Sequence, residues 1–210
     1  MKKFSTDNPF FEFMGELGEW IILNMLFVLT SLPVVTVGMS LTAMYQVALR
    51  RQRGESNYTA REYLKACRAE WKQSTILWLV FLLSGALLLF DVFYTKGWGK
   101  TFSIAIGCLL ALWSFLFSYV FPLQARFQNS MKNTVKNALF LSMKHLPYTI
   151  LIVALNSIPV ICVAAGTFVT MMALPIYCFL GFGLTAKINS IFFNKIFQEF
   201  MEMKKEESQA

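Results

Sequence analysis

The stretch STILWLVFLLSGALLLFDVFY, Ser74–Tyr94, decides the fold class of this chain. It contains 21 residues, of which only Asp91 is charged. A helix of about 20 apolar residues crosses the hydrocarbon core of a bilayer. A charge at the centre of that core costs about 2.5–3.5 kcal/mol or more, which explains why such a stretch carries so few. The stretch therefore predicts a membrane-spanning helix.

The rest of the chain has the same character. Hydrophobic residues make up 56% of the 210 residues and charged residues 15%, against about 25% charged in a typical soluble domain. Between Glu70 and Glu199 the only acidic residue is Asp91. We therefore expect a single all-α integral membrane domain over residues 1–210, a bundle of about five transmembrane helices. The predicted spans are about 18–38, 74–94, 101–125, 146–166 and 168–186.

Basic residues predict how the bundle is oriented. Of the 19 Lys and Arg residues, 15 fall in three segments, 50–72, 126–145 and 187–205. Loops rich in Lys and Arg stay on the cytoplasmic side of a membrane. With all three segments inside, five spans predict a multi-pass protein of the bacterial inner (cell) membrane, with the N-terminus outside and the C-terminus in the cytoplasm.

The first span has a second interpretation. Apolar character runs from Trp20 to Leu49, about 45 Å of helix, which is too long for one upright crossing. Pro33 and Gly38 lie in the middle and should break or kink the helix. One interpretation is a span that ends near Gly38, followed by a second helix that emerges into the cytoplasm. The alternative is a re-entrant hairpin of residues 20–53 with both ends inside.

Two amphipathic helices are predicted in the cytoplasmic segments, at about 58–72 and 128–145. The first begins with a capping box, Thr59-Ala-Arg-Glu62. In the second, an acid-free polar face could bind anionic lipid headgroups or a cytoplasmic protein, and both remain open. The candidate contact residues are Asn129, Lys132, Asn133, Lys136, Asn137 and Lys144.

Polar and small residues inside the spans predict helix packing rather than chemistry. Asn24, Ser84 and Asn156 are isolated polar residues, for which hydrogen bonds between helices are expected. Small residues in the third span recur at steps of three or four and should let a neighbouring helix approach closely. These are Ser103, Gly107, Ala111, Ser114 and Ser118.

Short motifs recur along the chain. Leu-Pro followed by Leu-Thr-Ala occurs within 32–43 and within 174–186, and Thr-Ile-Leu occurs at 75–77 and 149–151. Two related helix-plus-hairpin units, whose paired segments run in the same direction, would explain these matches. Chance similarity is the alternative, because each match is short.

The sequence shows no arrangement of residues that is typical of an enzyme active site. His145 is the only histidine, and no cysteine pair or acidic cluster accompanies it in the sequence, so a metal site is not expected. Within the predicted spans, no two carboxylates are placed to face each other. We therefore expect no catalytic residue, cofactor or metal, and no nucleic-acid partner.

The N-terminal third resembles the YesL family of bacterial multi-pass membrane proteins. The residues that carry the resemblance are Asn8–Phe11, Phe13-Met14, Leu17-Gly18, Ser31–Thr36 and Gly38, and Trp71–Thr75 also fits. The resemblance covers the whole chain in layout and is specific over about the first 80 residues. The family has no established activity, and its members look like companions of carbohydrate ABC importers.

This resemblance implies an accessory or scaffold protein of a transport system, with carbohydrate ABC import as the expected system. The expected partners are membrane lipid and ABC transporter subunits. A small transporter or channel in its own right is the alternative function.

Overall fold

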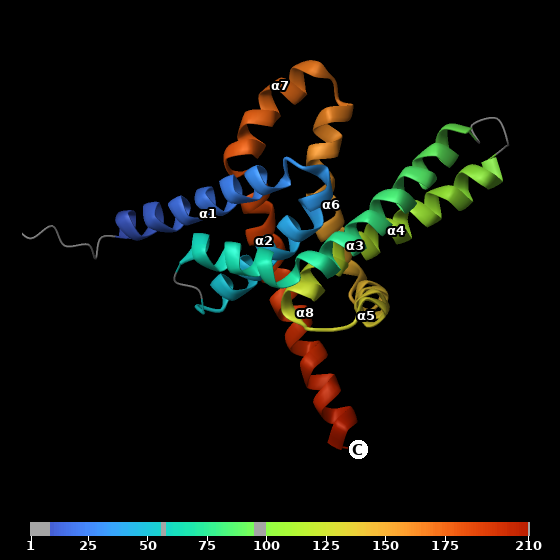
Figure 1. Ribbon diagram of the computed structural model, residues 1–210. Helices are drawn as coiled ribbons and strands as arrows, with labels where there is room; N and C mark the ends of the chain where they lie inside the picture. Colours follow the sequence, from blue (N-terminus) through green and yellow to red (C-terminus); the bar gives the residue numbers. More distant parts are fainter. Residues whose placement is uncertain (1–8, 56–57, 95–99, 210) are drawn as a thin grey trace, which may run out of the picture.

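The computed structural model describes residues 9–55, 58–94 and 100–209 (Figure 1). These residues form helices and short connections, with no strand among them. The elements are α1 (Pro9–Ser31), the 3-10 helix η1 (Val34–Thr36), α2 (Val37–Gln52), α3 (Thr59–Tyr94), α4 (Lys100–Arg126), α5 (Met131–Lys144), α6 (Leu146–Ala164), α7 (Thr167–Ile176), the π-helix η3 (Tyr177–Gly181) and α8 (Phe182–Gln209).

The predicted all-α membrane bundle is confirmed. Five helices are long and apolar enough to cross a membrane, as the sequence predicts. They are Phe13–Ser31, Thr59–Tyr94, Lys100–Arg126, Leu146–Ala164 and Thr167–Glu206, the last of which combines α7, η3 and α8.

The first two helices form a hairpin around Pro33. Because proline has no N–H and clashes with the preceding turn, α1 ends at Ser31. Beyond the turn the chain folds back: Ser40 Oγ donates to Thr30 Oγ1 at 2.9 Å. Much farther from the turn, Arg51 Nη1 lies 3.3 Å from Glu19 Oε2. Residues 19 and 51 therefore lie side by side, which is the geometry of the alternative hairpin rather than of a single kinked span.

A second ion pair supports this placement of α1. Glu16 Oε1 accepts from Lys187 Nζ of α8 at 2.6 Å. The Trp20 ring lies between the cations of Arg51 and Lys187, which are 5.9 and 5.4 Å from its centroid. An N-out, C-in arrangement requires Glu16 and Glu19 to lie at the opposite end of the bundle from Arg51. In the structure these two residues lie beside Arg51 and Lys187 instead. Which side of the membrane the N-terminus occupies stays a prediction, and residues 1–8 are outside the described part of the chain.

Helix α3 is longer than the sequence analysis predicts. Residues 58–72 and 74–94 were expected to be two helices, but Thr59–Tyr94 is continuous and, at 36 residues, about 54 Å long. The reason is local, since no glycine or proline interrupts residues 59–84. At its start, Thr59 Oγ1 accepts a hydrogen bond from Arg51 Nη1 at 2.8 Å, which fixes α3 to the end of α2.

Helix α2 lies at the centre of the bundle, with most of its residues buried. Its Gly38 lies directly against the Ser74 carbonyl and Trp78 of α3.

Helix α2 also contacts α8 on another side. Asn189 of α8 donates to Tyr45 Oη at 3.1 Å, and Asn194 donates to the Leu49 carbonyl at 3.2 Å. The residue numbers of these partners rise together along both helices, with offsets of 144 and 145 residues, so α2 and α8 run parallel. The two Leu-Thr-Ala motifs, 41–43 and 184–186, belong to these helices, so the paired segments run in one direction as predicted.

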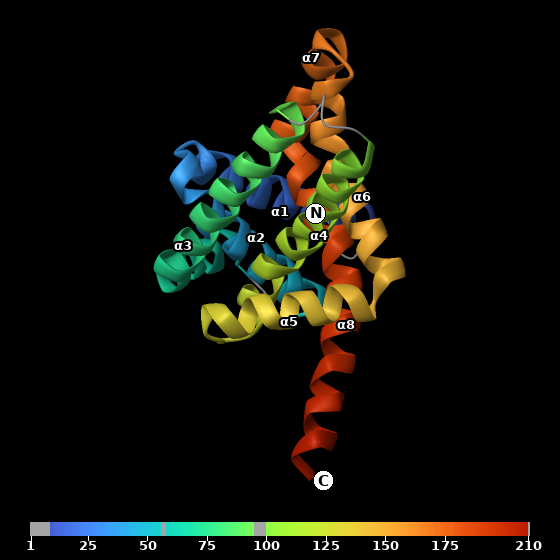
Figure 2. The same cartoon turned by 90° about the vertical axis from the view of Figure 1, so that its right-hand side faces the viewer.

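The remaining helices form two further hairpins that diverge from a common base. In both views, the free ends of α3–α4 and α6–α7 point away from α5, which lies across the base of the bundle (Figures 1 and 2). The contact between α3 and α4 involves Gly85, where an added Cβ would lie 2.7 Å from the Trp113 ring. Trp113 Nε1 also donates to Ser84 Oγ at 3.0 Å, which confirms the hydrogen bond expected of Ser84.

The predicted small-residue stripe of α4 does not form a contact along its length. Ser103, Gly107 and Ala111 are exposed, and a Cβ at Gly107 would meet no atom within 4 Å. Ser114 is half-buried, and Ser118 is buried. Aromatic residues on another face of α4 pack against α3 instead, so the first half of the stripe is not a contact between helices of this chain.

Gly38→Leu should destabilise the protein, because its Cβ would overlap Trp78 Cβ and lie 2.5 Å from the Ser74 carbonyl oxygen. Overpacking of this kind costs about 1–3 kcal/mol. Thermal unfolding in mild detergent measures the effect. The matched control, Gly107→Leu, should leave the transition unchanged. A larger loss at Gly107 than at Gly38 would contradict the packing described for α2.

Candidate functional site

A chain of polar side chains joins four helices in the middle of the bundle. Asn156 Nδ2 of α6 donates to Ser118 Oγ of α4 at 3.2 Å. Asn189 Nδ2 of α8 donates both to Asn156 Oδ1 at 2.8 Å and to Tyr45 Oη of α2 at 3.1 Å. Where water is excluded, such groups must find partners inside the protein. The hydrogen bond predicted for Asn156 is confirmed, and the structure adds Tyr45 and Asn189 to it.

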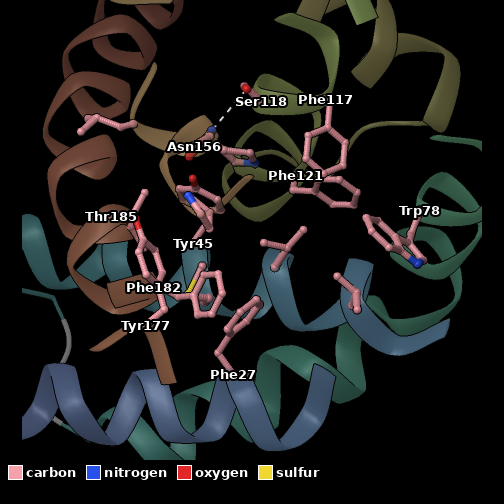
Figure 3. Close-up of a pocket in the computed structure, with 17 residues that line it drawn as sticks. Phe27, Tyr45, Trp78, Phe117, Ser118, Phe121, Asn156, Tyr177, Phe182 and Thr185 are labelled. Carbon is pink, nitrogen blue, oxygen red and sulfur yellow. Dashed lines mark hydrogen bonds between the residues drawn. The ribbon is translucent and has the colours of Figure 1, made fainter. Parts of the chain in front are cut away.

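An apolar cavity of about 210 Å³ lies beside this network (Figure 3). Polar residues in its wall include Tyr45, Asn156, Ser118 and Thr185. Trp78, Phe117 and Phe121 come from α3 and α4. None of its 17 lining residues carries a charge. The site can therefore hold an uncharged group, to which Tyr45 and Asn156 offer hydrogen bonds at one end.

Asn24 holds the irregular backbone that forms another part of the cavity wall. Its Nδ2 donates to the carbonyls of Tyr177 at 3.2 Å and Cys178 at 2.6 Å, and its Oδ1 accepts from the Gly183 N–H at 2.8 Å. The carbonyls belong to the π-helix η3, where the ordinary α-helical ladder is interrupted. The hydrogen bonds between helices expected of Asn24 are confirmed. Since Tyr177 and Phe182 line the cavity, this link also sets the shape of the site.

The structure places the predicted partner residues of α5 differently. The helix begins at Met131 rather than near residue 128, so Asn129 precedes it, and the Asn129 carbonyl accepts a hydrogen bond from Gln73 at 2.8 Å. Asn133 is exposed, and Asn137 is half-buried. The three asparagines therefore do not form one exposed row, because the row requires the helix to extend back to Asn129.

The lysines of α5 share an outer face with apolar side chains. Lys132, Lys136 and Lys144 are exposed, and so are Phe140 and Met143. Thr134, Ala138, Leu141 and Ser142 form the buried face. The exposed side of α5 therefore combines apolar side chains with positive charge, which attracts anionic lipid.

Helix α8 is fixed to the base of the bundle and then continues beyond it (Figures 1 and 2). His145 is buried at the start of α6, with Nε2 3.8 Å from Glu199 Oε2. Burial lowers the pKa of His145, and the charge of Glu199 opposes that shift. Nearby, Lys195 Nζ of α8 donates to Tyr148 Oη at 3.0 Å. The charged end of α8 beyond these contacts projects from the bundle.

Metal-ligating side chains are not gathered into a site in the described segments. Within 9–55, 58–94 and 100–209, no three His, Cys, Asp or Glu side chains lie close enough to hold a metal ion. The cysteines at 67, 108, 162 and 178 are free thiols. Polar side chains are organised both at the central cavity and at the base of the bundle.

Comparison with known proteins gives one similarity. The family model "Protein of unknown function, DUF624" matches residues 20–92. The matched segment contains most of α1, all of α2 and nearly all of α3. No curated protein and no solved structure matches the chain. The similarity therefore covers the α1–α2 hairpin and its main packing partner, and it assigns no activity.

Asn24→Leu should lower stability more than the loss of an ordinary side-chain hydrogen bond. The change removes three hydrogen bonds and leaves two carbonyls of η3 without them. Unpaired buried groups cost about 1–3 kcal/mol each. Thermal unfolding in mild detergent measures the change.

The matched control is Ser84→Ala, which removes one acceptor for Trp113. Its cost should be about 0.6 kcal/mol, the average for hydrogen bonds between membrane helices. Equal transitions for the two variants would contradict the role of Asn24 in holding η3.

Proposed function

We propose that this protein is an accessory or scaffold subunit of the bacterial cell membrane, which holds a cytoplasmic component of a transport system at the inner surface. The observation that carries the proposal is the projection of α8 beyond the base of the bundle, next to the exposed lysines of α5. An extended helix beside a basic surface provides a docking site away from the bilayer. The positive charge of the α5 lysines is complementary to an acidic surface on a protein or a membrane.

In this proposal the base of the bundle faces the cytoplasm. Exposed basic residues concentrate there, on the first turns of α3 at Arg61, Lys65 and Arg68 and on α5 at Lys132 and Lys136. Because loops rich in Lys and Arg stay on the cytoplasmic side of a membrane, this concentration of basic residues supports the orientation. Both ends of the α1–α2 hairpin and the end of α8 then lie on the cytoplasmic side. The hairpin enters the membrane from that side, while α3, α4, α6 and the α7–α8 segment cross it.

The transport system itself is suggested by the resemblance of residues 8–38 to the YesL family. Members of that family look like companions of carbohydrate ABC importers, so subunits of such an importer are the partners we propose. The outer face of α5, with Phe140 and Met143 between its lysines, also supports binding to anionic lipid. Lipid binding would hold α5 flat and present the end of α8 to the partner.

A small transporter or channel is a second candidate function, favoured by the central cavity. The cavity lies where α2, α4, α6 and the start of α8 meet. Transport would require the Asn156–Asn189 and Asn189–Tyr45 hydrogen bonds to open, because these bonds join the helices around it. Uptake of a substrate by vesicles containing only this protein would favour the second candidate over the first.

The proposed orientation predicts which engineered cysteines react in intact cells. Gly15→Cys and Glu55→Cys should both be shielded from a membrane-impermeant maleimide, since residues near each lie together at the base. Thr167→Cys, at the far ends of α6 and α7, should be labelled. The background lacks the four native cysteines, and labelling of lysed cells controls for reactivity. Labelling at position 15 but not at 55 would contradict the hairpin.

Removing the projecting end of α8 should release the partner without unfolding the bundle. Met203 is the last residue that packs against the core, so a chain ending there keeps these contacts. We expect importer subunits that co-purify with the full chain in mild detergent to be lost from this variant. The free energy of unfolding, followed by thermal unfolding, should stay within about 0.5 kcal/mol of the value for the full chain, as for other surface changes.

Charge reversal on α5 separates lipid from protein docking. The variant Lys132→Glu/Lys136→Glu should weaken binding of the protein to vesicles of anionic lipid, by about 1 kcal/mol per lysine. Asn133→Ser, which changes an exposed neutral residue on the same helix, is the matched control. If both the charge-reversal and the truncated variant retain every importer subunit, the scaffold proposal fails and α5 is a lipid-contacting helix only.

A further inference from the structure

The central cavity has the size of a small organic molecule. Protein interiors contain few voids larger than a water molecule, and an empty cavity lowers stability. At about 210 Å³ it exceeds a 150 Å³ engineered cavity that binds benzene. By that comparison it holds a molecule of about eight non-hydrogen atoms. The cavity is independent of the docking surface proposed for α5 and α8.

Its walls suit an uncharged, mainly apolar molecule. The rings of Trp78, Phe117 and Phe121 lie on one side, and Phe27 and Phe182 lie on another (Figure 3). An ionised ligand would lose its hydration without gaining a counter-ion, because no charged residue lines the cavity. Saturated or aromatic carbon therefore fits most of the space.

One end of the cavity offers a specific hydrogen bond. Tyr45, which is 5% exposed, lines the cavity, and its Oη accepts from Asn189 Nδ2. An amide nitrogen is only a donor, so this bond leaves the Tyr45 hydroxyl proton for another acceptor. Asn189 Oδ1 is also buried without a partner among the described residues. At the cavity end the Tyr45 hydroxyl lies beside Asn156, and a ligand hydroxyl or carbonyl oxygen placed there can accept from Tyr45.

A second cavity indicates how such a molecule could enter. It has about 510 Å³ and lies between α3, α4 and α6. Trp78, Phe117, Ser118 and Asn156 line both cavities. The second cavity also includes the exposed Val160, whose surroundings in a bilayer are acyl chains. Movement of the shared rings would connect the inner cavity to the lipid phase.

We infer that the central cavity is a binding site for a small, uncharged amphipathic molecule with an apolar body and one hydroxyl or carbonyl oxygen, which enters from the bilayer. The body lies among the aromatic rings of α3 and α4. The oxygen lies at Tyr45 and Asn156, where it completes the polar network that joins α2, α6 and α8.

Photolabelling of the full-length protein in lipid vesicles tests this site. The probe is a diazirine-bearing octanol, and the matched probe is the corresponding alkane without the hydroxyl. We expect the alcohol to label peptides from α2 and α4 at the cavity, and unlabelled 1-octanol to compete. The alkane should label the cavity about fivefold less, which corresponds to one hydrogen bond. Both probes should label exposed residues such as Leu83 and Ile104 equally.

Two variants place the site, and a third controls for general effects. Leu41→Trp fills the cavity that Leu41 lines and should abolish labelling there. Tyr45→Phe keeps the ring but should lower labelling by the alcohol about fivefold, to the level of the alkane. Leu83→Trp, at an exposed position, should change neither.

Retention of the alcohol preference in Tyr45→Phe would overturn the assignment of the polar end, whether or not Leu41→Trp folds. Equal labelling of the cavity by both probes in the unchanged protein, without competition by 1-octanol, would show nonspecific partitioning of apolar solutes and would overturn the site.

Discussion

The fold depends on the close approach of α2 to α3. Gly38 permits this approach. Just beyond it, Ser74 Oγ donates a hydrogen bond to Thr42 Oγ1 at 2.9 Å, and Thr42 Oγ1 in turn donates to the Gly38 carbonyl at 3.0 Å. In a bilayer, lipid tails are as apolar as leucine, so helices associate through tight packing and hydrogen bonds rather than through the hydrophobic effect. A short helix of small and hydroxyl-bearing residues can therefore occupy the centre of the bundle, where α3, α8 and α4 all contact it.

Two breaks in the helical ladder lie next to this core. The turn at Pro33 separates α1 from α2, and η3 separates α7 from α8. Irregular backbone inside a membrane is tolerated only where the protein itself supplies its hydrogen bonds. At the first break, Thr36 Oγ1 donates to the Thr30 carbonyl at 2.6 Å, and at the second Asn24 bonds to η3. The breaks bring side chains from α1, η3 and α8 toward one another, and the cavity beside Tyr45 lies among them.

Much of this architecture could be predicted from the sequence, because span length, the break at Pro33 and the positions of basic residues are local signals. The hairpin of residues 20–53 was one of two interpretations, and the ion pair between Glu19 and Arg51 that distinguishes them joins residues with no local relation. The packing partner of a small residue cannot be predicted from local sequence either. Gly85 and Gly107 both lie in apolar helices, yet of the two only Gly85 lies against an aromatic ring, that of Trp113. Asn189 was missed for a related reason. It lies in a segment read as cytoplasmic, and its partner Tyr45 is 144 residues away.

The central claim is that α1 and α2 form a hairpin whose two ends lie together at the base of the bundle. The distance between spin labels at Glu19→Cys and Arg51→Cys, measured by pulsed electron resonance in lipid nanodiscs with the native cysteines removed, tests it most directly. Because Arg51 Nη1 and Glu19 Oε2 lie 3.3 Å apart, we predict a label separation well below the thickness of the hydrocarbon core, about 30 Å. A separation of about 30 Å or more would place the two residues on opposite sides of the membrane and contradict the hairpin.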